Sequence, residues 1–160
     1  MPIYALTNDQ AISLAKQKAN GHVKFIAIDY NWGPPIPGRF DSDWMRIWGV
    51  SIDDPEMGTL YLYGTRDDYK WDVNVPFSPM SNLENPQYFL YYLELNRVDF
   101  PVEFVLRFDR KDGSSYYDNN NEKNYRILNA NQGRGFSDIG TAEAIFDFES
   151  ITPCHLYFPA

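Results

Sequence analysis

After His22, side-chain character alternates with a period of two, and this pattern limits the possible folds more than any other feature of the sequence. The strand-like runs read HVKFIAIDY, WMRIWGVSI, TLYLYG, YKWDVNV, QYFLYYLEL, PVEFVLRFD and SSYYD. Clusters rich in Gly, Pro and Asp, such as GPPIPGRFDSD and RKDG, separate these runs. Short strands punctuated this often predict an all-β fold, an immunoglobulin-like antiparallel β-sandwich of about eight strands.

Alternation within the runs also predicts which side chains face inward. The expected inward residues are Val23, Phe25, Leu60, Leu62, Phe104, Leu106, Phe108 and Tyr116.

Two segments flank the predicted sandwich. A short helix is expected through DQAISLAKQKA, capped by Thr7 or Asn8 and ended by the Asn-Gly pair that follows it. At the other end, a polar, glycine-rich stretch precedes AIFDFES and CHLYF, which form either two last strands or a tail packed along the sandwich edge. We therefore expect a single domain over 1–160, with a helical appendage at 1–21 and an extension at 128–160.

Charge and apolar content exclude several classes of partner. The chain has 14 Lys and Arg against 22 Asp and Glu, a net charge of −8, so its field repels nucleic acid and anionic membranes. The N-terminus does not resemble a signal peptide, and no run approaches the roughly 18 apolar residues of a membrane helix. Cys154 is the single cysteine. A cytoplasmic protein is expected.

Signals for catalysis or metal binding are weak. The sequence contains no GxSxG, GxxxxGK[ST] or HExxH motif, and His22 and His155 both lie in strand-like contexts, where a structural role is expected. The acidic pairs Asp53–Asp54 and Asp67–Asp68 fall in predicted turns, where Asp bonds the backbone. We expect no catalytic residues and no cofactor.

The segment DNNNEKN resembles a calcium loop only in part. Asp118, Asn120 and Glu122 alternate as oxygen ligands do in an EF-hand. Glycine is missing at the sixth position, which is Lys123, and glutamate at the twelfth, which is Asn129. We expect no metal site.

The same segment, within YYDNNNEKNY at 116–125, allows two interpretations. Amide groups in a loop can bond the adjacent hydroxyls of a sugar, while neighbouring aromatic rings cover its C–H face. Alternatively, the asparagines tolerate left-handed backbone angles in a hairpin turn and bond their own main chain. The residues themselves leave both interpretations open.

Residues 102–127, VEFVLRFDRKDGSSYYDNNNEKNYRI, resemble the C-terminal half of carbohydrate-binding module family 21. This family comprises the starch- and glycogen-binding domains of fungal glucoamylases and of glycogen-targeting phosphatase subunits. TLYLYGTRDDYKW also resembles its strand, Asp-rich turn and sugar-stacking tryptophan. The resemblance implies non-catalytic binding of an α-glucan as a polysaccharide or oligosaccharide, with Trp71 and Tyr117 as the stacking pair. The other implied sugar-binding residues are Asp118, Asn119, Asn120, Asn121 and Tyr125.

Two departures from the family pattern keep other functions open. Val105 replaces a second ring, and SIDDPEMG replaces the N-x-A-[FY] segment of the family's second binding surface. The alternatives are a cytosolic lectin for a galactose- or N-acetylhexosamine-containing glycan, or a protein-interaction scaffold such as a phosphatase-targeting domain. HVKF at 22–25 and RVDF at 97–100 fit the phosphatase-docking pattern RVxF, although both lie in or beside predicted strands.

Overall fold

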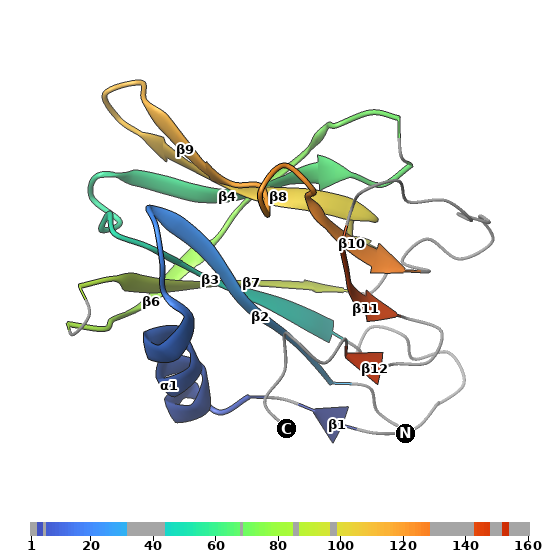
Figure 1. Cartoon of the computed structure of the whole chain (residues 1–160), viewed down its shortest axis with the longest axis horizontal. Helices are drawn as coiled ribbons and strands as arrows, with labels where there is room; N and C mark the ends of the chain where they lie inside the picture. The colour runs from blue at the N-terminus through green and yellow to red at the C-terminus, as the bar shows by residue number, and fades with distance from the viewer. Residues whose placement is uncertain are drawn as a thin grey trace.

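Two β-sheets packed face to face form the body of the molecule (Figure 1). The computed structural model describes residues 3–4, 6–31, 44–67, 69–84, 87–96, 99–128, 143–147 and 152–153. The five-stranded sheet contains, in spatial order, β1 (Ile3–Tyr4), β2 (Val23–Asn31), β3 (Trp44–Ser51), β7 (Phe89–Asn96) and β6 (Ser78–Asn82). The seven-stranded sheet contains β12 (Thr152–Pro153), β11 (Glu143–Asp147), β10 (Tyr125–Leu128), β8 (Glu103–Arg110), β4 (Gly58–Thr65) and β5 (Val73–Pro76), with β9 (Ser115–Asp118) also paired to β8.

Alternate residues of the strands fill the space between the two sheets. In β4, Leu60 and Leu62 are 0% exposed, whereas Tyr61 between them is only partly buried. The five-stranded sheet contributes Phe25 and Ile47 to the same apolar cluster. Seven of the eight predicted inward residues belong to this cluster, and the eighth, Tyr116, packs against it. The predicted β-sandwich is confirmed.

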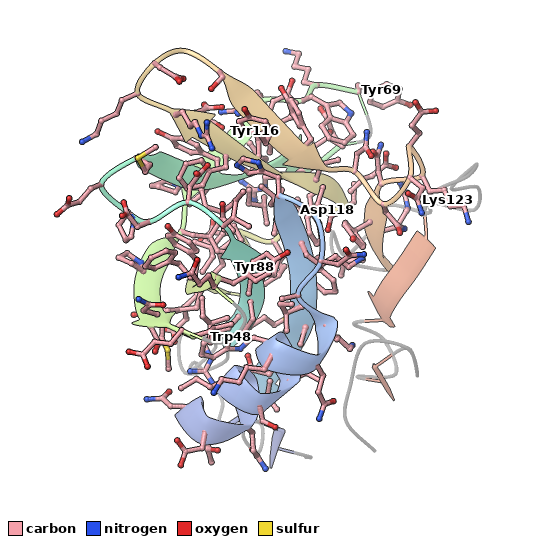
Figure 2. All side chains as sticks on the ribbon, turned by 60° about the vertical axis from the view of Figure 1, so that its left-hand side comes forward. Trp48, Tyr69, Tyr88, Tyr116, Asp118 and Lys123 are labelled. Atoms are coloured by element: carbon pink, nitrogen blue, oxygen red, sulfur yellow. The ribbon has the colours of Figure 1, made fainter. Side chains whose placement is uncertain are left out.

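Helix α1 (Asn8–Lys18) covers the outer face of the five-stranded sheet (Figure 1). The hydroxyl of Thr7 accepts a hydrogen bond from the Gln10 amide at 3.1 Å, and the Gln10 side chain accepts one from the Thr7 amide at 2.9 Å, which forms a capping box. Ala15 is fully buried and belongs with Trp48 to a second apolar cluster between helix and sheet (Figure 2). The predicted helix is thus a third layer of the fold.

The segment that precedes the helix is tied to the sheet by a buried carboxylate. Asp29 of β2 is 0% exposed and accepts hydrogen bonds from the Leu6 amide at 2.8 Å and from Trp48 Nε1 at 2.9 Å. Arg46 pairs with the same carboxylate and donates to the Leu6 carbonyl at 3.1 Å. Because buried charge is stable only when paired and hydrogen-bonded, this network fixes where the chain enters the helix.

The structure has more strands than the sequence pattern predicts. Strand β6 lies within PFSPMSNLENP, which reads as a turn cluster because it contains three prolines. It forms the edge of its sheet, and its pairing with β7 shifts register between Pro79 and Ser81. An edge strand with an irregular register tolerates proline, since one of its sides has no ladder to complete.

The C-terminal extension adds to the seven-stranded sheet. Strand β11 pairs parallel to β10, and β12 pairs antiparallel to β11, so the sandwich is not wholly antiparallel. CHLYF lies outside the described residues. In the part of the chain that the structure describes, no helix has the length and apolar character needed to span a membrane.

Candidate functional site

The outer face of the seven-stranded sheet carries a group of aromatic side chains. Strand register places Tyr61 of β4 opposite Arg107 of β8, and Arg107 opposite Tyr117 of β9. One row along, Tyr63 lies opposite Val105, and the Trp71 ring lies 5.4 Å from the Tyr63 ring, centroid to centroid. We call this surface the ring face. Its members are Tyr61, Tyr63, Trp71, Val105, Arg107 and Tyr117.

Exposure differs across the ring face and the loop beside it. Tyr117 is 53% exposed, whereas Trp71 is half-buried. Tyr69, in the loop between β4 and β5, is 83% exposed. Figure 2 shows Tyr69 near the end of the molecule where Lys123 of the asparagine turn lies. The rings that are open to a ligand are therefore those at the borders of the face.

The predicted stacking residues Trp71 and Tyr117 lie on the same face, but they do not form an adjacent pair. Trp71 packs on Tyr63 of β4, and Tyr117 lies on β9, with β8 between these two strands. Neighbouring strands are about 4.8 Å apart, so β4 and β9 are separated by about 10 Å. The two rings are the ends of an extended surface, which suits an oligosaccharide better than one sugar unit.

A fixed arginine occupies the middle of the ring face. Arg107 Nε donates to Asp109 Oδ1 at 2.9 Å, and its Nη2 donates to Asn74 Oδ1 at 2.7 Å. Its Cζ atom lies 5.1 Å from the ring centroids of both Tyr61 and Tyr63. Because Asn74 is on β5, the arginine side chain crosses β4 and covers part of these two rings.

In the asparagine turn, residues 119–124, most side-chain amides form hydrogen bonds within the turn or to a neighbouring strand. Asn119 Oδ1 accepts from the Glu122 amide at 3.1 Å, and Asn120 Nδ2 donates to the Asn124 carbonyl at 3.1 Å. Asn124 Nδ2 donates to Glu103 Oε2 at 2.8 Å. Asn120, Asn121, Glu122 and Asn124 all have positive φ angles, from 54° to 72°. These features are those of the alternative interpretation, a turn whose asparagines tolerate left-handed angles.

Two of the predicted sugar-binding residues are internal, which corrects the sequence-based site. Asp118 is 8% exposed and accepts hydrogen bonds from the Phe25 amide at 2.6 Å, the Tyr125 hydroxyl at 2.7 Å and the Asn120 amide at 3.0 Å. Tyr125 is 0% exposed, and its ring packs 4.8 Å from that of Phe25. Tyr125 has no exposed surface, and Asp118 has little. Asp118 instead joins β9 to β2 of the other sheet.

A second polar cluster holds the β8–β9 hairpin. Asp53 accepts from His22 Nε2 at 2.6 Å and from Arg110 Nε and Nη2 at 2.9 and 2.8 Å. The His22 ring stacks on Tyr116 at 3.6 Å, and Arg110 Cζ lies 4.8 Å from the same ring. Burial raises the pKa of Asp53, but hydrogen bonds from Arg110 and His22 outweigh it and hold this pKa below its usual value.

The described residues of the two acidic pairs make hydrogen bonds that support the fold. Asp53 is engaged as above, and Asp54 Oδ1 accepts from the amides of the turn that follows it. Asp67 Oδ1 accepts from the Tyr69 and Lys70 amides, while Asp68 lies outside the described residues. No group of three or more His, Cys, Asp or Glu side chains placed to hold a metal ion occurs among the described residues.

The first phosphatase-docking pattern is buried. In HVKF, Val23 is 5% and Phe25 is 1% exposed, and both lie in β2, so this segment is not a free peptide. In RVDF, Arg97 and Val98 lie outside the described residues, and Phe100 is 1% exposed.

The sequence-based site omitted Tyr61, Tyr63, Tyr69 and Arg107. Alternation in TLYLYG could have shown that its two tyrosines face away from the leucines, and the arginine alternates with the inward residues of its strand in the same way. The reach of Arg107 across β4 depends on side-chain placement and has no signal in the sequence.

Comparison with known proteins gives one distant structural match. No family model matches the chain, and no curated protein matches its sequence. A solved structure of the starch-binding domain of Rhizopus oryzae glucoamylase, in complex with beta-cyclodextrin and maltoheptaose, is similar with a TM-score of 0.47 and 16% sequence identity. The match covers 68% of this chain and 93% of that one.

Proposed function

We propose that this protein binds carbohydrate without catalysis, on the ring face, and that its ligand is an α-glucan of the starch or glycogen type. The observation that carries the proposal is the placement of Trp71 and the exposed Tyr117 on one sheet face, with the exposed Tyr69 in the adjoining loop. Aromatic rings on a rigid sheet offer the C–H faces of a pyranose chain an apolar platform of fixed shape. The sequence signature at 102–127 supports the choice of glucan.

The contacts available predict modest affinity. A stacked ring or a neutral hydrogen bond contributes on the order of 1 kcal/mol net, and association itself has an entropic cost. A few such contacts give a dissociation constant in the micromolar to millimolar range for one site.

The absence of catalysis is part of the proposal. Asp109, the carboxylate nearest the centre of the ring face, is bonded to Arg107 and to the Ser115 hydroxyl. Glu103 accepts from Arg126 Nη1 at 3.1 Å and from Asn124. Both carboxylates are therefore already engaged by side chains of the fold. A cytoplasmic location is likewise proposed, and fluorescence microscopy of the tagged protein tests it.

A lectin that prefers another sugar is the second candidate. Val105 is 5% exposed and lies opposite Tyr63, so an aliphatic side chain occupies the place where the related family often has a second ring. A glycan array that contains maltooligosaccharides beside galactose- and N-acetylhexosamine-terminated glycans separates the two candidates.

Calorimetric titration with β-cyclodextrin and maltoheptaose tests the proposal. Trp71→Ala and Tyr117→Ala should each weaken binding about ten-fold, because loss of about 1.4 kcal/mol of contact corresponds to that factor. Met57→Ala is the matched control, since Met57 is 46% exposed and lies outside the ring face, in the turn that precedes β4. If both ring variants bind as the parent does, the ring face is not the binding site.

A further inference from the structure

We propose that Arg107 and Asp109, rather than the asparagine turn, form the hydrogen bonds of the ring face to a sugar, and that together they select uncharged glycans with free vicinal hydroxyls. This inference rests on the proposed function and assigns the polar half of the same site.

Arg107 has N–H groups that make no hydrogen bond among the described residues, and its side chain is held in place. Its Nε and Nη2 atoms each donate one hydrogen bond, to Asp109 and Asn74. A guanidinium has five N–H groups, so three of them have no acceptor among the described residues. Contacts with Tyr61 and Tyr63 at 5.1 Å further restrict the side chain. The Arg107 side chain is 15% exposed, so the part of the guanidinium that a ligand can reach is already fixed in position, which lowers the entropic cost of binding.

Asp109 provides an acceptor beside these donors. Its Oδ1 atom accepts from Arg107 at 2.9 Å and from the Ser115 hydroxyl at 2.8 Å. The Oδ2 atom makes no hydrogen bond within the described part of the chain, and the side chain is 37% exposed. Each sugar hydroxyl both donates and accepts, so two adjacent hydroxyls can bond to Asp109 Oδ2 and to an Arg107 N–H group at the same time.

Most side-chain amides of the asparagine turn already make hydrogen bonds. The amides of Asn119, Asn120 and Asn124 are bonded within the turn or to Glu103. Only Asn121, which is exposed, keeps a side-chain amide without a hydrogen bond among the described residues. A bonded amide can bind a sugar only with the donors or lone pairs that its existing hydrogen bond leaves free, and in the orientation that this bond fixes.

The charges on this face are balanced, which favours an uncharged ligand. Arg107 is paired with Asp109, and Arg126 is paired with Glu103. The net charge of the chain is −8, so a uronate or sulfated glycan would meet an unfavourable overall field.

The test compares β-cyclodextrin with its 2,3-di-O-methyl derivative, which keeps the sugar rings but lacks the vicinal hydroxyl donors. The parent should bind the methylated ring at least ten-fold more weakly. Arg107→Met and Asp109→Ala should each weaken binding of β-cyclodextrin at least ten-fold and reduce the discrimination against the methylated ring. Asn121→Ala and Lys111→Met should bind as the parent does. The latter removes a positive charge from the exposed turn of the same hairpin.

The possible results distinguish a failure of this inference from a failure of the proposed function. Equal binding of the two cyclodextrins by the parent, or unchanged binding by folded Arg107→Met and Asp109→Ala, overturns this inference alone. So does a loss that follows Asn121→Ala instead. A parent that binds neither cyclodextrin nor any glycan of the array overturns the proposed function as well. If the array identifies another sugar, the same variants are measured with that sugar.

Discussion

Replacement of Asp118 by alanine should destabilise the whole sandwich, because this carboxylate joins its two sheets. Three donors lose their acceptor: the Phe25 amide at 2.6 Å, the Tyr125 hydroxyl at 2.7 Å and the Asn120 amide at 3.0 Å. Phe25 and Tyr125 are 1% and 0% exposed, so water reaches these two donors only if the core opens. Hydrogen bonds to charged groups contribute about 1.5–3 kcal/mol each, and two buried ones give an expected loss of about 3 kcal/mol or more.

Urea denaturation followed by tryptophan fluorescence measures this loss. A domain of this size loses about 2–4 °C in Tm per kcal/mol, so thermal unfolding should shift down by about 6–12 °C. In the double variant Asp118→Ala with Tyr125→Phe, the second change should cost little, because its hydroxyl has already lost its partner. Glu56→Ala removes an exposed carboxylate whose side chain makes no hydrogen bond among the described residues, and it should leave the midpoint unchanged. A cost below about 1 kcal/mol for Asp118→Ala would refute the structural role of this residue.

Three further predictions concern the supports of the fold. The pKa of Asp53 is held below its unfolded value, so the stability that its ionised form provides is present above about pH 4 and is lost as pH falls through the folded-state pKa. Asp53→Asn should therefore flatten the dependence of the urea midpoint on pH below 4. An unchanged slope contradicts this. Arg46→Met should cost about 3–5 kcal/mol in urea denaturation, because it leaves the buried Asp29 without its cation; a neutral effect would mean that the network does not anchor the helix. Thr7→Ala should cost about 1 kcal/mol through loss of the N-cap, whereas Thr7→Ser should be nearly neutral, and equal losses for both would point to the methyl group instead.

The parts of the fold that depend on local pattern could be predicted from the sequence. Leu60 and Leu62 alternate with the partly buried Thr59, Tyr61 and Tyr63, and period-two burial follows directly from strand geometry. The helix was equally predictable from its cap. Strand β6 was not, since its Pro79 is permitted only because the strand lies at an edge, and an edge is a property of the assembled sheet.

The sequence named two rings of the candidate site, whose sugar-binding role stays a prediction, but not the polar groups beside them. Trp71 and Tyr117 were named from the sequence, and the structure places both on the outer face of one sheet. Asp118 looks like a ligand-binding residue from its neighbours in sequence, yet its partner Phe25 is 93 positions away, and no local pattern reports such a contact. The reach of Arg107 to Asn74 on another strand is non-local in the same way.

An NMR titration with maltoheptaose tests the location of the binding site most directly, through the indole N–H signals of two tryptophans. Trp71 lies on the ring face, whereas Trp48 is 1% exposed beneath the helix, and its Nε1 donates to Asp29. The account predicts that the Trp71 indole and the amides of β8 and β9 shift progressively with ligand, while the Trp48 indole stays fixed. Shifts confined to the helix and the five-stranded sheet, with Trp71 unmoved, would contradict it.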